Sequence, residues 1–60
     1  MGEKLRAARK AAGLTQVQLA ELVGCDQNHI SRWEKGSHEP GVLTVKKMAQ
    51  ILGCKIDDLV

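Results

Sequence analysis

Four polar side chains in the middle of this 60-residue chain have the chemistry needed to recognise the edges of nucleic-acid bases. They are Gln27, Asn28, Ser31 and Arg32. The amide of glutamine or asparagine can form a two-point hydrogen-bonded pair with adenine, and the guanidinium of arginine can form one with guanine. A solvated helix surface has a similar composition, so these residue types need a supporting pattern before they indicate a binding site.

The spacing of apolar residues predicts that these side chains project from a helix over residues 27–35. Ile30 and Trp33 are three residues apart, so they share one helix face. The four polar residues lie away from this face, and we therefore expect them to face outward. Gly36 can adopt the left-handed conformation that ends a helix.

A shorter helix is expected just before this one, and the pair would form a helix-turn-helix over residues 16–35. Leu19 and Val23 are four residues apart and share a face. Gly24 suits a left-handed helix end, and Asp26 is a preferred N-cap residue for the second helix.

The remaining segments predict further helices around this motif. Residues 3–12 are rich in alanine, residues 43–52 repeat apolar side chains at helical spacing, and residues 57–59 suit a short terminal helix. Thr15 and Gln18 have the spacing of a capping box. We expect an all-α, five-helix fold with a core of Leu5, Leu19, Ala20, Val23, Cys25, Ile30, Trp33, Val45, Met48 and Leu52.

Length and composition favour one small cytoplasmic domain over residues 1–60. No apolar run approaches the roughly 18 residues of a membrane span, and no charged-then-apolar leader opens the chain. The formal net charge is +2, and the excess of basic residues lies between the amino terminus and Gly36. An excess of positive charge beside the helix-turn-helix favours binding to an anionic partner.

The two cysteines and two histidines are potential metal ligands, so a metal site is an alternative interpretation of the sequence. Cys25 and His29 are four residues apart, and His38 and Cys54 would complete four ligands. These spacings match no compact zinc pattern, and Cys25 belongs to the core side whereas His29 should face out. We expect no metal and no cofactor, and we expect both thiols to be reduced, buried and inert.

The pattern as a whole resembles the lambda repressor/Cro-like family of helix-turn-helix domains, also called Xre-type. The resemblance extends from about residue 5 to residue 59 and implies a five-helix DNA-binding domain. Its third helix would lie in the major groove and its second would cross the DNA backbone. The matching residues are Gly13-Leu14-Thr15-Gln16, Leu19-Ala20, Val23-Gly24-Cys25, Ile30-Ser31-Arg32-Trp33-Glu34-Lys35-Gly36, Pro40 and Leu52-Gly53.

The resemblance also implies residue roles. Gln27, Asn28 and Arg32 fall at the base-reading positions of the family, and Ser31 shares their outward face. Gln16 corresponds to a glutamine that bonds a phosphate and braces helix three. In the same way, Arg9 and Glu34 match a family pair that joins helix one to helix three.

Phosphate contacts are expected at the amino end of helix two and in the loop after helix three. Helix amino ends offer free amide donors and a positive dipole to phosphates. The loop is small and basic, although an ordinary turn would have the same sequence. The expected phosphate-contacting residues are Gln16, Thr15, Lys35, Ser37 and His38.

We therefore expect a sequence-specific double-stranded DNA-binding regulator, a repressor of a bacterium or phage. The alternative is a module of the same fold that binds a protein such as a toxin, with DNA binding secondary. That alternative requires a contiguous apolar patch in place of the polar face. An enzyme is not expected, because the chain has no phosphate loop, paired catalytic acids or supported nucleophile, and no small-molecule ligand is expected either.

A homodimer is expected, at least on DNA, because domains of this type usually read two half-sites about one helical turn apart. Scattered apolar residues outside the predicted core are candidates for the contact between protomers. They are Val17, Leu43, Ile51, Leu59 and Val60.

Overall fold

The computed structural model describes residues 2–60, which form four α-helices and one short 3-10 helix. The elements in chain order are α1 (Gly2–Ala11), α2 (Gln16–Val23), α3 (Gln27–Lys35), α4 (Val42–Leu52) and η1 (Ile56–Asp58). Within the described residues there is no strand, so the predicted all-α class is confirmed.

The expected fifth α-helix is wrong: the chain makes a single 3-10 turn there. The amide of Asp58 bonds the Lys55 carbonyl at 3.0 Å, and the amide of Leu59 bonds the Ile56 carbonyl at 2.9 Å. Both bonds reach three residues back, which is the 3-10 pattern. The other helices differ from their predicted bounds by at most one residue at each end, which is within the ordinary uncertainty of helix ends.

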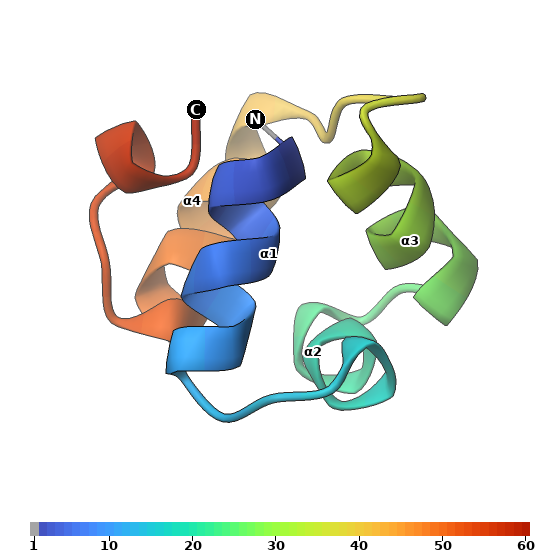
Figure 1. The fold of residues 1–60 in the computed structure, drawn as a ribbon, viewed down its shortest axis with the longest axis horizontal. Helices are drawn as coiled ribbons and strands as arrows, with labels where there is room; N and C mark the ends of the chain where they lie inside the picture. The colour runs from blue at the N-terminus through green and yellow to red at the C-terminus, as the bar shows by residue number, and fades with distance from the viewer. Residues whose placement is uncertain (1) are drawn as a thin grey trace.

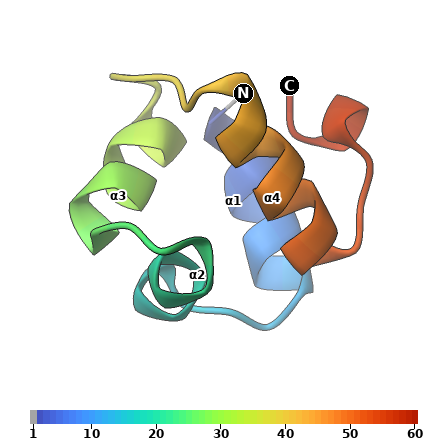
Figure 2. The same cartoon turned by 180° about the vertical axis from the view of Figure 1, so that it is seen from behind.

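Helix α1 lies between two groups of elements. Figure 1 shows α3 on one side of α1, α4 and η1 on the other, and α2 below them. Figure 2 shows the same arrangement from behind, with α4 in front of α1. The start of α1 and the carboxyl terminus lie at the same end of the molecule (Figures 1 and 2), where the Lys4 ammonium donates to the Val60 carbonyl at 2.8 Å.

The core gathers apolar side chains from the four α-helices and from Leu59, which follows η1. Two of the predicted core residues, Cys25 and Leu52, are only half-buried and pack against the edge of the cluster. Cys25 lies in the turn between α2 and α3, and Leu52 is the last residue of α4. The fully buried side chains of largest volume are Leu5, Leu19, Ile30, Met48 and Leu59.

Leu59 is therefore a core residue and not part of a surface for a second protomer. Its exposed fraction is 0%, and it reaches the core from the segment after η1. Ile51, another dimer candidate, packs half-buried against the core. The other three candidates, Val17, Leu43 and Val60, are exposed.

The turn between α2 and α3 depends on backbone conformation more than on side-chain capping. Gly24 has φ 87°, in the left-handed region, and its amide donates to the Ala20 carbonyl at 2.8 Å. Asp26 stands at the N-cap position of α3, but its side chain makes no capping hydrogen bond, so that prediction is wrong. The exposed carboxylate of Asp26 leaves the first amides of α3 without a side-chain partner.

The capping box at the start of α2 is present. The hydroxyl of Thr15 accepts a hydrogen bond from the Gln18 amide at 3.1 Å, and the Gln18 side chain accepts one from the Thr15 amide at 2.9 Å. These reciprocal bonds satisfy two donors that the helix leaves free. They fix the point at which the chain enters the helix-turn-helix.

Gly2 is buried where the start of α1 meets the end of α3. A Cβ at Gly2 would collide with the backbone carbonyl of Glu34 and would lie 2.9 Å from that of Trp33. Only a residue without a side chain allows this approach, which brings the positive end of the α1 dipole to the carbonyls that end α3.

Gly2→Ala should lower the free energy of unfolding by about 1–3 kcal/mol, because the backbone must shift to admit the methyl group. Gly41→Ala is the matched control, since nothing lies within 4 Å of a Cβ there and φ is −66°. We expect less than about 1 kcal/mol for the control. Urea denaturation measures the free energy of unfolding of both variants. Equal decreases would show that the close approach of Gly2 to α3 does not determine the cost of the substitution.

Candidate nucleic-acid interface

The outer face of α3 is polar and its inner face is apolar. Gln27, Asn28 and Arg32 are exposed, and Ser31 is half-buried beside them. On the opposite face, Ile30 is 0% exposed. The structure thus brings the four proposed base-reading side chains onto one surface of one helix.

Trp33 anchors α3 and also supports a surface histidine. Its side chain belongs to the core, with 8% of the residue exposed. The ring of exposed His29 lies edge-on to the Trp33 indole, with 6.0 Å between ring centroids and an interplanar angle of 71°. Such edge-to-face pairs are favourable. Sequence reasoning expected His29 to face outward but missed this contact, although its spacing of four residues from Trp33 was a signal for it.

A buried ion pair holds α3 against α1. The Arg9 Nε donates to Glu34 Oε2 at 2.6 Å, and the Arg9 Nη2 donates to Glu34 Oε1 at 3.1 Å. The side chains are 9% and 4% exposed. The Arg9 Nη1 also donates to the Leu14 carbonyl at 2.8 Å, which ties the α1–α2 loop to the same guanidinium. Two-point Arg–carboxylate geometry of this kind is strong and directional.

Gln16, the first residue of α2, connects this pair to the outer face of α3. Its Nε2 donates to Glu34 Oε1 at 3.2 Å. Its Oε1 accepts a hydrogen bond from the Gln27 Nε2 at 3.4 Å. Gln16 therefore contacts both ends of α3, which is the bracing geometry that the family resemblance implies. The contact with Gln27 joins residues 11 apart in sequence, and no local pattern could have indicated it.

A hollow of about 220 Å³ lies where α1, α2 and α3 meet. Because the Glu34 carboxylate is already paired with Arg9, the charges that remain at the hollow are those of Arg6 and Lys35. The hollow is therefore positive and lies beside the polar face of α3. Its lining residues are Arg6, Arg9, Gln16, Ser31, Glu34 and Lys35.

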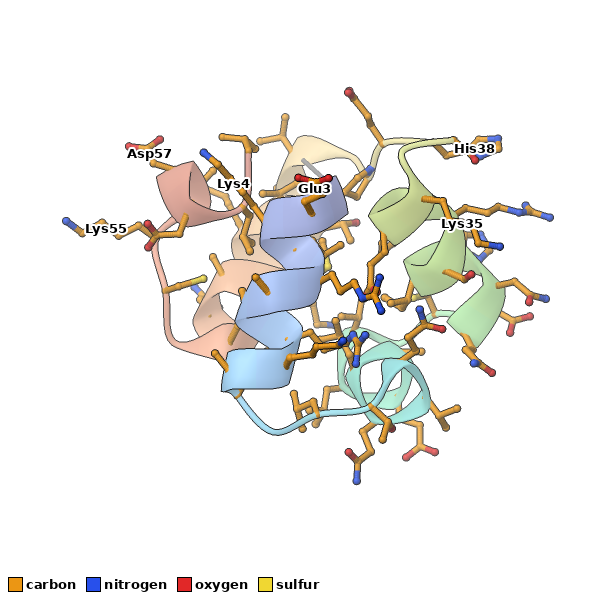
Figure 3. All side chains as sticks on the ribbon, in the orientation of Figure 1. Glu3, Lys4, Lys35, His38, Lys55 and Asp57 are labelled. Atoms are coloured by element: carbon orange, nitrogen blue, oxygen red, sulfur yellow. The ribbon has the colours of Figure 1, made fainter. Side chains whose placement is uncertain are left out.

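The other proposed phosphate-contacting residues surround this surface. Lys35, Ser37 and His38 are exposed at the end of α3 and in the loop that follows. Figure 3 shows Lys35 and His38 on the α3 side of the molecule, far from Lys55. Thr15 is also exposed, but its hydroxyl already serves as the N-cap of α2.

The cysteines are poorly suited to metal binding or redox chemistry. Burial raises the pKa of the Cys25 thiol, and neighbouring Asp26 raises it further. Burial likewise raises the pKa of the Cys54 thiol, with a further contribution from Asp58. A raised pKa lowers the thiolate fraction, and the thiolate is the form that binds metals and attacks electrophiles. Both thiols are half-buried, less covered than the sequence predicted, and residues 2–60 contain no group of three potential metal-ligating side chains.

The fold, with the polar outer face of α3, defines a helix-turn-helix protein. The sequence profile of the helix-turn-helix family matches residues 5–59, and the chain belongs to that family in its lambda repressor-like, or Xre, form. No helix within residues 2–60 is long and apolar enough to span a membrane.

The similar proteins include phage repressors and a restriction-modification controller. The chain is 36% identical over 59 residues to repressor protein C2 of Salmonella phage P22, with 98% of this chain and 27% of the repressor covered. It is 32% identical over 60 residues to the immunity repressor protein of Bacillus phage phi105, with 100% and 42% covered. The chain thus spans less than half the length of these two repressors.

Solved structures with the same fold include one with DNA bound. The P22 c2 repressor in complex with a synthetic operator has a TM-score of 0.90 and 34% identity, with 98% of this chain and 89% of that chain covered. The restriction-modification controller protein C.AhdI from Aeromonas hydrophila has a TM-score of 0.89 and 32% identity, with the same coverage.

Proposed function

We propose that this chain is the DNA-binding domain of a transcriptional regulator of the repressor type. The observation that carries the proposal is the outer face of α3, where Gln27, Asn28 and Arg32 present amide and guanidinium groups to solvent. The similarity to the P22 c2 repressor, whose structure was solved with an operator, supports the same assignment. The domain would act by binding DNA in the cytoplasm and not by catalysis.

In this proposal α3 enters the major groove, and the positive surface around it contacts the two phosphate backbones. The hollow between α1 and α3 would receive a phosphate, with Arg6 and Lys35 supplying the charge and Gln16 a hydrogen bond. The loop residues Ser37 and His38 would contact the backbone beyond the end of α3. Phosphate contacts provide affinity, whereas base contacts provide specificity.

Arg32→Ala should relax base preference at one position of the selected site. Each good two-point pair between a side chain and a base provides about 1–3 kcal/mol of discrimination. Sites selected by the wild-type domain from a random duplex pool supply the probe, and binding to its single-base variants supplies the measurement. Lys46→Ala, on the exposed surface of α4, is the control and should leave every base preference unchanged. Equal losses for Arg32→Ala on selected and random DNA would contradict a base-reading role.

We also propose that the domain binds DNA as a homodimer. The support is a pair of adjacent apolar side chains at the start of α4, Val42 and Leu43, which are 75% and 80% exposed. Covering these side chains with a second copy would remove apolar surface from water. The sites selected from the random pool would then contain two symmetric half-sites about one helical turn apart.

A further inference from the structure

Four side chains form one continuous path of hydrogen bonds from the interior of the domain to the proposed base-reading face. Arg9 donates twice to Glu34, Gln16 donates to Glu34, and Gln27 donates to Gln16. The inner end of the path is almost fully buried, and its outer end is exposed on α3.

The direction of these bonds is determined at the inner end. A carboxylate can only accept hydrogen bonds, whereas an amide side chain has a donor group and an acceptor group. Glu34 therefore compels Gln16 to turn its NH₂ group inward, which leaves the Gln16 oxygen facing Gln27. That oxygen accepts a hydrogen bond from the Gln27 NH₂ group at 3.4 Å, which favours one orientation of the Gln27 amide.

The orientation of this amide decides what it can recognise. The edge of adenine in the major groove offers an N6 donor and an N7 acceptor in a fixed order. With one N–H engaged by Gln16, Gln27 retains its oxygen and its second N–H for a two-point pair with adenine. A reversed amide at the same docking position would face donor with donor and acceptor with acceptor.

We propose that Glu34 is a specificity-determining positioning residue, which sets the base preference of Gln27 through the amide of Gln16. The inference rests on the proposed function, because it requires that Gln27 faces DNA bases. Glu34 itself need not touch DNA, since its effect travels through two hydrogen bonds.

The test uses Glu34→Gln in the full 60-residue chain and the duplex selected by the wild-type domain. The substituted amide presents NH₂ in place of one carboxylate oxygen, so Gln16 is no longer compelled to one orientation. The informative base pair is the one at which Gln27→Ala loses discrimination, and the readout is the ratio of Kd values for the four base pairs at that position. Glu21→Gln is the matched control, because it makes the same change of charge at an exposed site on α2.

We expect wild-type discrimination of about fivefold to 150-fold at this base pair, and a reduction by at least about threefold in Glu34→Gln. Ratios at other base pairs and in Glu21→Gln should change by less than about twofold. In the Gln27→Ala background, Glu34→Gln should have no further effect on the ratio. A purely structural role would instead weaken binding to all duplexes alike.

Several results would overturn the inference. An unchanged ratio in folded Glu34→Gln, an equal loss at every base pair, or a further loss in the Gln27→Ala background would each do so. A Gln27→Ala variant with normal discrimination would overturn it while leaving DNA binding itself intact. A wild-type domain that binds no duplex would instead overturn the proposed function and the inference with it.

If circular dichroism shows that Glu34→Gln is unfolded, Gln16→Met provides the second variant. Methionine keeps the length of the side chain but removes both hydrogen bonds while leaving the Arg9–Glu34 pair intact. This variant should weaken binding to all duplexes through the lost phosphate contact and should also lose at least about threefold discrimination at the Gln27 base pair. A uniform loss without the additional loss at that base pair would contradict the inference.

Discussion

Arg9→Met should lower the free energy of unfolding by about 3–5 kcal/mol, because it leaves the buried Glu34 carboxylate without its ionic partner. The Glu34 side chain is 4% exposed, and among residues 2–60 its two oxygens accept from Arg9 and Gln16. The substitution also removes the donor to the Leu14 carbonyl, which joins the α1–α2 loop to the pair. A 60-residue domain has a total stability of only about 3–9 kcal/mol, so this loss is a large part of the total.

A double-mutant cycle separates the pair from its surroundings. The substitutions are Arg9→Met, Glu34→Met and both together, and the measurement is urea denaturation at low temperature. The double variant should be much more stable than the sum of the two losses predicts, since no buried charge remains unpaired. The Lys10→Met control removes an exposed charge one residue away and should change stability by less than about 0.5 kcal/mol. Additive losses would mean that Arg9 and Glu34 do not interact in solution.

Ile30→Ala should lower the free energy of unfolding by about 2–5 kcal/mol. Ile30 is 0% exposed and, with Trp33, forms the buried face of α3. The substitution removes apolar contacts and leaves a cavity between α3 and the rest of the core. DNA affinity should fall as the unfolded fraction rises, and excess DNA should restore the folded state by mass action.

Leu22→Ala provides the comparison for Ile30→Ala. Leu22 is a large aliphatic residue of α2 that is 52% exposed and lies outside the proposed dimer contact. Its truncation should lower the free energy of unfolding by less than about 1 kcal/mol, because much of its surface stays in water on folding. Similar losses for the two variants would contradict the burial of Ile30 on the inner face of α3.

Local sequence patterns were sufficient to predict the helices and most of the core. The glycine after α2 has the left-handed conformation that was expected, and the capping box of Thr15 is formed. Ile30 and Trp33 face the core because helical periodicity places them on one face. Each of these features depends on residues within a few positions of one another, which is why sequence alone could indicate them.

The features that the sequence could not indicate depend on contacts between distant segments. The burial of Leu59, a candidate for the dimer contact on sequence grounds, requires η1 to lie against α1 and α4. The Gln16–Gln27 contact and the close approach of Gly2 to α3 likewise need the helices to be placed relative to one another. At Asp26 a local pattern was misleading. Aspartate is a preferred N-cap residue, but this side chain is exposed and makes no capping hydrogen bond.

The central claim is that α3 and the positive surface around it bind DNA through phosphate and base contacts. Its most direct test is the salt dependence of binding to the selected duplex, measured by fluorescence anisotropy. Each phosphate that a lysine or arginine side chain neutralises contributes about −0.9 to the slope of log K against log salt concentration. With Arg6 and Lys35 of both protomers on the backbone, the slope should be about −3 to −4. A slope near zero, or no measurable binding at low salt, would contradict the claim.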